Sequence, residues 1–159
     1  MSTMDMSSSA STESYEVASI DMKIEVVALP VSDVDRAKIF YGRLGWRLDN
    51  DLVRGEDFRV VQMTPRHSAC SIAFGKGFTT AEPGSVRRLE IVVEDIEAAR
   101  EDLLARGVEV GEIYHGGNLP GPDPERRSYQ SYATFSDPDG NGWLMQEITT
   151  RLPGREWED

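Results

Sequence analysis

The chain has 159 residues, with 28 acidic and 17 basic side chains and a formal net charge of −11. This acidic balance argues against nucleic acid and anionic membrane surfaces as partners, because both require a basic surface on the protein. The single cysteine, Cys70, excludes an internal disulfide, and no apolar run approaches the roughly 20 residues of a membrane span. Without a recognisable secretory signal either, we expect a cytoplasmic domain with Cys70 as a buried structural thiol.

The first half of the chain predicts a strand, a helix and three more strands. Residues 1–21 are rich in serine and threonine, which predicts a disordered N-terminal tail. Residues 23–31 are rich in β-branched side chains and predict a strand. Asp33 fits the N-cap of a helix with apolar positions at helical spacing, and Gly45 fits its C-terminal stop. The three further strands are predicted at residues 46–48, 58–63 and 69–74.

The second half repeats this pattern after a Gly/Pro/Thr-rich linker at residues 76–85. Residues 88–93 predict a strand, Asp95 fits the N-cap of a second helix, and Gly107 fits its end. A strand is predicted at 108–113, followed by a long loop at 114–128. A hairpin of residues 129–135 and 143–149 closes the pattern around a turn rich in Asp, Pro, Gly and Asn, and residues 151–159 form a short polar tail.

The two halves align without gaps at an offset of 62 residues. A series of identical or similar residues in one register indicates duplication of a βαβββ unit, which exposes an apolar sheet face and needs a second unit to cover it. The matched pairs are Val27/Leu89, Leu29/Ile91, Val31/Val93, Asp33/Asp95, Asp35/Glu97, Ala37/Ala99, Lys38/Arg100 and Gly45/Gly107.

Three motifs carry a family resemblance. They are V-S-D-V-D-R-A-K-x-F-Y-x-x-L-G-W in the first half, E-D-I-E-A-A-R-x-x-L-x-x-R-G-V in the second, and F-S-D-P-D-G-N-G-W in the last hairpin. With them the chain resembles the vicinal oxygen chelate superfamily, the glyoxalase, bleomycin-resistance and extradiol-dioxygenase group. The resemblance implies an α+β fold over residues 22–150, with modules at 22–76 and 86–150. Their eight strands would form a curved sheet, folded into a cup around a small-molecule site.

Strand alternation indicates which side chains line that cup. Val27, Leu29 and Val31 share a face that we expect beneath a helix, so Val26 and its neighbours on the other face line the cup. In the second module the same reasoning directs Arg88 and Glu90 into the cup. A carboxylate beside a guanidinium can bind a ligand or remove a proton from it, so we predict Glu90 as a catalytic base.

The resemblance also implies where a metal ion would bind in metal-dependent members. Those positions fall at Val26, Arg88 and Leu144, and the strand at 69–74 contributes no ligand-type residue. Valine and leucine cannot bind a divalent cation and arginine repels one, so we expect no metal cofactor. If a divalent metal ion is present, the remaining candidates for its ligands are Glu90, Glu147 and His115.

The long loop at 114–128 supplies the other candidate residues, because a loop of this length is usually functional or disordered. His115 is the natural titrating group and the predicted catalytic partner of Glu90. Arg126, Arg127 and Tyr129 suit an anionic or phenolic ligand. The expected ligand-binding set is Arg88, Val26, Gln62, Arg127, Tyr129, Leu144 and Gln146.

Three functions remain open at this point. The first is a metal-free enzyme that moves protons, of isomerase or lyase type, with Glu90 as base. The second is a protein that binds and sequesters a metabolite or antibiotic. The third is a metal-dependent lyase or dioxygenase with displaced ligands. In each case we expect a small-molecule ligand and no nucleic acid or membrane partner, and a homodimer is compatible with all three.

Overall fold

The computed structural model describes residues 14–157, so most of the predicted N-terminal tail lies outside the described residues. The first sheet, sheet A, has the strand order β1-β4-β3-β2. β1 runs parallel to β4, and the other neighbours are antiparallel. The elements of this half are β1 (Val26–Ala28), α1 (Val34–Arg43), β2 (Arg47–Arg54), β3 (Phe58–Thr64) and β4 (Ser71–Lys76).

The second sheet, sheet B, has the order β5-β9-β8-β6-β7. As in sheet A, the first and last strands in chain order, here β5 and β9, are parallel neighbours. Two helices and two mixed sheets confirm the predicted α+β fold, although the strands form two hydrogen-bonded sheets of four and five strands. The elements of this half are β5 (Leu89–Val93), α2 (Ile96–Ala105), β6 (Tyr114–His115), β7 (Leu119–Pro120), β8 (Ser131–Ser136) and β9 (Gly142–Glu147).

Both helices begin as predicted and are exact copies in length and position. Asp33 and Asp95 are the N-caps, and their carboxylates accept hydrogen bonds from backbone N–H groups of the first turns. The helices span ten residues each and start 62 residues apart, which matches the sequence repeat. Gly45 and Gly107 follow the helices with φ of 85° and 80°, a conformation that glycine adopts without steric cost.

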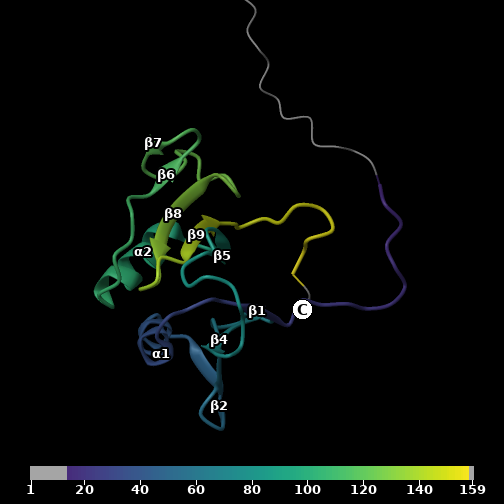
Figure 1. Cartoon of the computed structure of the whole chain (residues 1–159). Coiled ribbons are helices and arrows are strands. Elements are labelled where there is room, and N and C mark those ends of the chain that lie inside the picture. The colour runs from purple at the N-terminus through teal and green to yellow at the C-terminus, as the bar shows by residue number, and fades with distance from the viewer. Residues whose placement is uncertain (1–13, 158–159) are drawn as a thin grey trace, which may run out of the picture.

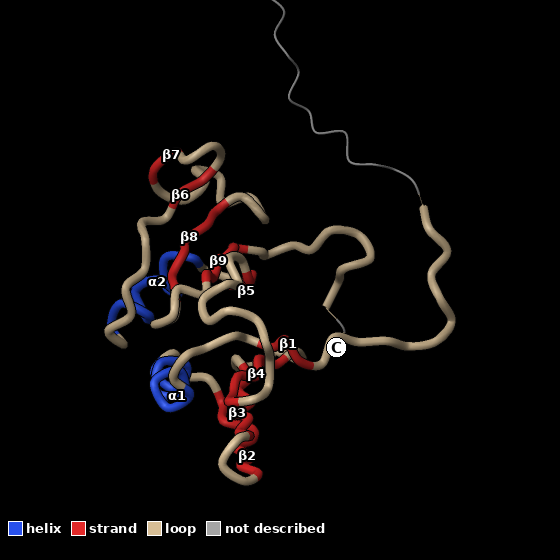
Figure 2. Tube along the Cα trace, in the orientation of Figure 1, coloured by secondary structure: helices blue, strands red, loops and turns tan. Residues whose placement is uncertain are grey.

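One hydrophobic core joins the two halves. It includes Tyr41 from α1, Phe74 from β4, Leu103 from α2 and Trp143 from β9. Figures 1 and 2 show the two helices on the same side of the molecule, with sheet A extending to one end and sheet B to the other. Each sheet therefore packs one face on this core and leaves its other face, here called the free face, without a helix.

The turn before β9 connects the halves by hydrogen bonds. The buried carboxylate of Asp137 accepts hydrogen bonds from the Tyr41 hydroxyl at 3.0 Å and from the Asn141 backbone and side chain. Asn141 donates to the carbonyl of Pro30 and accepts from the N–H of Val86. Burial, with the Asp137 carboxylate beside it, raises the pKa of Tyr41, so its hydroxyl stays protonated. The motif that carried the family resemblance thus joins both modules.

Several predicted elements differ from the structure. Residues 108–113 are not a strand: Val108 and Val110 are buried, but β6 takes the place beside β8 instead. β2 continues to Arg54 through residues predicted as a connection, because its backbone pairs with β3 as far as Arg54 opposite Phe58, and Asp51 also forms an ion pair with Arg59. The strand predicted at 23–31 is only three residues long. Within residues 14–157, no helix has the length and apolar character needed to cross a bilayer.

Cys70 departs from its predicted burial. It precedes β4 rather than lying inside it, and its side chain is half-buried. The preceding turn, Pro65 to Ser68, is closed by a backbone hydrogen bond of 3.1 Å, and exposed His67 occupies a left-handed conformation with φ of 65°. This turn leaves the thiol near the surface.

Candidate functional site

The free face of sheet B carries two rows of side chains. Strand register sets Glu90 of β5 beside Leu144 of β9 and Thr134 of β8, and paired residues in a sheet share a face. The next row contains Val92, Gln146, Tyr132 and Tyr114. The ring centroids of Tyr114 and Tyr132 lie 5.4 Å apart with the rings tilted by 32°, and the amide of Gln146 donates to the carbonyl of Tyr129. This face thus combines aromatic rings with a few polar groups.

The free face of sheet A has an apolar centre and polar side chains toward its outer strand. Val26 of β1 pairs with Ser71 of β4, and the next row sets Gln62 beside Ala73. Val26 and Gln62, both predicted ligand contacts, therefore lie on the same sheet face and are half-buried. The register also assigns the apolar side chains of Ala28, Leu52, Phe58 and Val60 to this face, with the polar side chains of Asn50 and Arg54 on its outer strand.

The predicted pair of Arg88 and Glu90 forms. The Arg88 Nε atom donates to the Glu90 carboxylate over 3.0 Å, and both side chains are at least half exposed. An exposed ion pair of this kind contributes little to stability, which leaves both groups available to a ligand. Leu144, opposite Glu90, is 6 % exposed, and Gln146 is half-buried.

His115 does not join Glu90. Its strand partner is Ser131, so it lies on the sheet face opposite to Tyr114 and Glu90. Its Nδ1 atom is 2.8 Å from the carbonyl of Gly121, within the short hairpin of β6 and β7. The predicted catalytic pair is therefore separated by the thickness of the sheet.

Glu147 also lies on the core side of sheet B, as alternation from Leu144 predicts. Its carboxylate, 1 % exposed, accepts two hydrogen bonds from Arg126 and one from the N–H of Ile96 at the start of α2. The Arg126 guanidinium holds the pKa of Glu147 below its ordinary value, so it stays ionised. Arg126 also binds Glu97 and Asp95, which attaches the long loop to α2.

The loop arginines are engaged within the chain. Arg127 donates to both oxygens of the Asp123 carboxylate, at 2.8 and 3.0 Å, and holds the pKa of that carboxyl well below its usual range. Tyr129 has φ of 72°, which is unusual for a bulky residue, and its hydroxyl accepts from the N–H of Leu152. The guanidinium of Arg127, predicted to bind an anionic ligand, therefore binds the carboxylate of Asp123 within the chain instead.

A family-type metal ion does not fit these residues. The positions that the resemblance assigns to ligands hold Val26, Arg88 and Leu144, none of which donates an electron pair to a divalent cation. The alternative set is not assembled either, because Glu147 is bound to Arg126 and His115 faces away from Glu90. Among residues 14–157, no three His, Cys, Asp or Glu side chains gather closely enough to hold a metal ion.

Sequence reasoning missed the aromatic pair of Tyr114 and Tyr132. The signal for Tyr132 was its pairing with Gln146 in the predicted hairpin, which assigns both side chains to the free face. Tyr114 lies in the range predicted as a long loop, and only the short β6 strand aligns it with Tyr132. The apolar side chains of β3, Phe58 and Val60, were likewise not assigned to a face.

Comparison with known proteins adds a family and several solved structures. The family model for the Glyoxalase/Bleomycin resistance protein/Dioxygenase superfamily matches residues 23–145. The chain is 30 % identical to TnmS3, an antibiotic binding protein from Streptomyces sp. CB03234, over 84 % of this chain and all of that one, with a TM-score of 0.65. It is 32 % identical to a glyoxalase/bleomycin resistance protein from the same Streptomyces strain, over 79 % and 100 % of the two chains, with a TM-score of 0.61.

A more distant structure has the same fold. The bleomycin resistance determinant encoded on the transposon Tn5 is 16 % identical over 81 % of this chain and all of that one, with a TM-score of 0.56. Among curated proteins, none matches the chain at a significant level.

Proposed function

Since the chain belongs to the Glyoxalase/Bleomycin resistance protein/Dioxygenase superfamily, we propose that it binds an apolar, aromatic small molecule of antibiotic type and sequesters it unchanged. The observation that carries this proposal is the composition of the two free faces. Ligand sites are mostly apolar and aromatic, with a few polar groups that fix orientation. Phe58, Val60 and Leu52 supply the apolar part on sheet A, and Tyr114 and Tyr132 supply the aromatic part on sheet B.

The arrangement of titrating groups favours binding over proton transfer. A general base acts only within hydrogen-bond reach of the proton that it removes, and its partner must reach the same substrate. Glu90 and His115 lie on opposite faces of sheet B, so one substrate cannot contact both. The Arg88–Glu90 ion pair is the one observation that favours an enzyme, and a metal-free isomerase or lyase using this pair is the second candidate.

A second copy of the chain would complete the site. Ligand pockets usually enclose 70–90 % or more of a drug-sized ligand, and a single open sheet face cannot do so. The free faces of sheets A and B differ in character, because sheet A has an aliphatic centre and sheet B has an aromatic pair with polar groups. We propose that the sheet A face of one copy and the sheet B face of another enclose the ligand in a homodimer.

The proposal is tested by calorimetric titration of the purified protein with bleomycin and with a panel of apolar, aromatic antibiotics. We expect at least one compound to bind with a dissociation constant of about 1 µM or below. Mass spectrometry of the bound compound after long incubation is expected to return it chemically unchanged. Light scattering during gel filtration is expected to give the mass of a dimer.

A matched pair of variants locates the site. Val60→Arg introduces a charge on the sheet A free face, and Val53→Arg makes the same change on the other face of the adjoining strand, at an exposed position. We expect Val60→Arg to weaken binding about 100-fold and Val53→Arg to change it less than about threefold. Equal effects of the two variants would place the ligand elsewhere. A chemically altered compound, lost in Glu90→Gln, would establish the enzyme instead.

A further inference from the structure

A separate hollow lies at the junction of the two halves, away from the apolar centre of the sheet A free face. Its volume is about 870 Å³, within the usual range of small-molecule pockets. It lies between the edge strands β1 and β5, under the chain that leaves β9, and the turn at residues 65–70 forms one wall. Neither the fold nor the proposed function gives this space a role.

The floor of the hollow is apolar. The residues that form it come from both sheets and mostly from their core sides, so the hollow is a partly open continuation of the core. They are Val27, Ile72, Leu89, Ile91, Val92, Val93, Trp143 and Ile148. An apolar floor of this size, open to solvent, favours a ligand with an apolar ring system, because its burial removes hydrocarbon surface from water.

The rim of the hollow is basic, which is unusual in a chain with a net charge of −11. Three arginines line it: Arg66, Arg151 and Arg155. In the described part of the chain none of the three has a carboxylate partner, whereas Arg88, Arg126 and Arg127 all do. The carboxylates of Glu90 and Glu94 also line the space, and Glu90 is already paired with Arg88.

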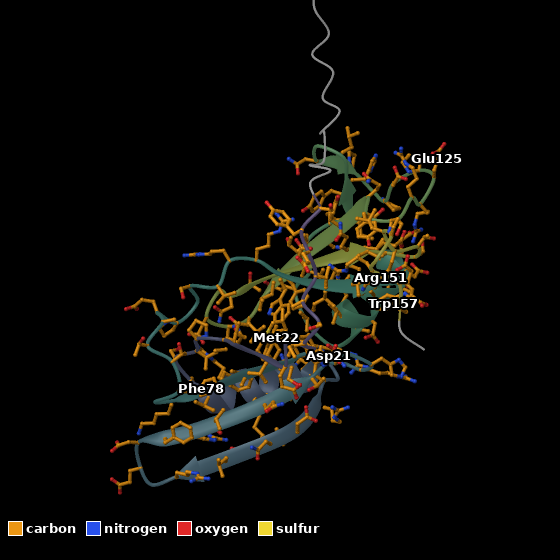
Figure 3. All side chains as sticks on the ribbon, turned by 90° about the vertical axis from the view of Figure 1, so that its right-hand side faces the viewer. Asp21, Met22, Phe78, Glu125, Arg151 and Trp157 are labelled. Carbon is orange, nitrogen blue, oxygen red and sulfur yellow. The ribbon has the colours of Figure 1, made fainter. Side chains whose placement is uncertain are left out.

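Arg151 is the clearest sign of a missing anionic partner. Its Nε atom is buried and has no hydrogen-bond partner within residues 14–157. A buried donor left without a partner costs free energy, and a charged one costs more. The guanidinium lies over the indole ring of Trp157 at 3.7 Å, and Figure 3 shows the two labelled residues side by side. The stack orients the cation and leaves Nε without an acceptor.

The C-terminal segment holds this arginine in position at one side of the hollow. The backbone N–H groups of Thr149 and Thr150 donate to the Ser128 hydroxyl, and that of Leu152 donates to the Tyr129 hydroxyl. Beyond these anchors, Trp157 is 59 % exposed and presents its ring at the opening. The segment thus supplies both a fixed cation and an aromatic surface.

From this geometry we infer a second ligand site, which takes a flat aromatic carboxylate. The ring system lies on the apolar floor between Trp143 and Trp157, and the carboxylate accepts hydrogen bonds from Arg151 and Arg155. A guanidinium suits a carboxylate because its N–H donors match the two oxygens in a planar, two-point contact. The site touches the edge of the sheet B free face at Glu90 and Val92 but lies mostly on the core sides of both sheets, and it does not require the proposed function.

The experiment uses the full chain and 1-naphthoate as the probe, followed by calorimetry and by quenching of tryptophan fluorescence. We expect saturable binding of one probe per chain. Arg151→Gln and Arg155→Gln are each expected to weaken it by about tenfold, the cost of one charge-assisted hydrogen-bonded contact. Arg151→Lys retains the charge but not the planar donors. Its naphthoate affinity is expected to fall between that of the unchanged protein and that of Arg151→Gln.

Two controls separate this site from other sites. Arg54→Gln removes an exposed arginine of β2 that has no ion pair in the described chain, and Val60→Arg changes the sheet A free face. Both are expected to leave naphthoate affinity within about twofold. The uncharged 1-naphthamide is expected to bind at least about tenfold more weakly.

The inference is overturned by naphthoate affinity that is unchanged in Arg151→Gln and Arg155→Gln, by equal affinity for 1-naphthamide, or by the absence of saturable binding. A loss of affinity in Val60→Arg alone would also overturn it, because the probe would then occupy the free face. Since bleomycin binding is measured separately, failure at the hollow leaves the proposed function standing, and the reverse also holds.

Discussion

Replacing Tyr41 with phenylalanine removes a buried hydroxyl that joins the two halves of the molecule. This hydroxyl donates to the Asp137 carboxylate at 3.0 Å and accepts from the indole N–H of Trp143 at 2.9 Å. The ring of Tyr41 remains in the core against Phe74 and Trp46, so the substitution creates almost no cavity. The change therefore tests the hydrogen bonds separately from the packing.

The expected loss follows from the partners that remain. The Asp137 carboxylate keeps its hydrogen bonds from Asp139 and Asn141, so it loses one of several. Trp143 loses the acceptor of its N–H and becomes an unsatisfied buried donor, since it is 5 % exposed. A hydrogen bond to a charged group and an orphaned buried donor together cost about 3 kcal/mol. For a domain of this size, that lowers the melting temperature by roughly 10 °C.

The assay is equilibrium unfolding in urea, followed by tryptophan fluorescence and circular dichroism. Tyr114→Phe is the matched control, because the Tyr114 hydroxyl has no hydrogen-bond partner in the described residues, and it is expected to change stability by less than about 0.5 kcal/mol. A loss below about 1 kcal/mol in Tyr41→Phe, with the same dependence on urea, would refute the assignment of a connecting role to this hydroxyl.

Three further substitutions test other parts of the structure. Glu147→Gln is expected to cost about 2 kcal/mol at neutral pH. Arg126 lowers the pKa of Glu147, so the stabilisation from this ion pair is present above about pH 5 and disappears as pH falls through the folded-state pKa. The free energy of unfolding, measured at several pH values, should therefore fall less steeply toward acid pH in the variant. The same steepness in both proteins would contradict the ion pair. Gly75→Ala is expected to cost about 3 kcal/mol of stability, because a Cβ there would lie 1.8 Å from the Arg59 carbonyl oxygen. Gly117→Ala serves as its control in thermal unfolding, because a Cβ at that position meets no atom within 4 Å. Glu90→Gln is expected to change antibiotic affinity less than about threefold, because Arg88 already compensates its charge; a larger change in calorimetry would assign Glu90 a direct contact.

Local signals predicted the helices and the repeat well, and failed where tertiary pairing decides the structure. The caps at Asp33 and Asp95 were predictable because cap chemistry acts over three or four residues, and the two helices that they begin are equal in length. Residues 108–113 alternate like a strand, but they form only a single backbone hydrogen bond to β8, from Gly111 to Thr134, and no strand, while Val108 and Val110 are buried. Two residues of the adjoining loop, Tyr114 and His115, take that place beside β8, which no local pattern indicates.

The candidate site was predictable to a similar degree. The repeat register assigned Val26 and Glu90 to free faces, because alternation within a strand is a local property. His115 was predicted to act together with Glu90, and its position on the opposite face of sheet B follows only from the pairing with Ser131, because a loop sequence carries no information about sheet face. The engagement of Arg127 by Asp123, four residues earlier, was visible as a pair of opposite charges, although only the turn geometry makes it bidentate.

The hydrogen bonds around Asp137 also bear on how the chain folds during synthesis. Asp137 and Trp143 lie 96 and 102 residues after Tyr41, and Asn141 lies 111 residues after Pro30. Contacts between such distant residues form slowly, because a long loop must close before they are made. The first module therefore emerges from the ribosome with the hydroxyl of α1 and the end of β1 still lacking their partners. It reaches its final packing only when the residues up to Trp143 have been made, so both modules mature together rather than one after the other.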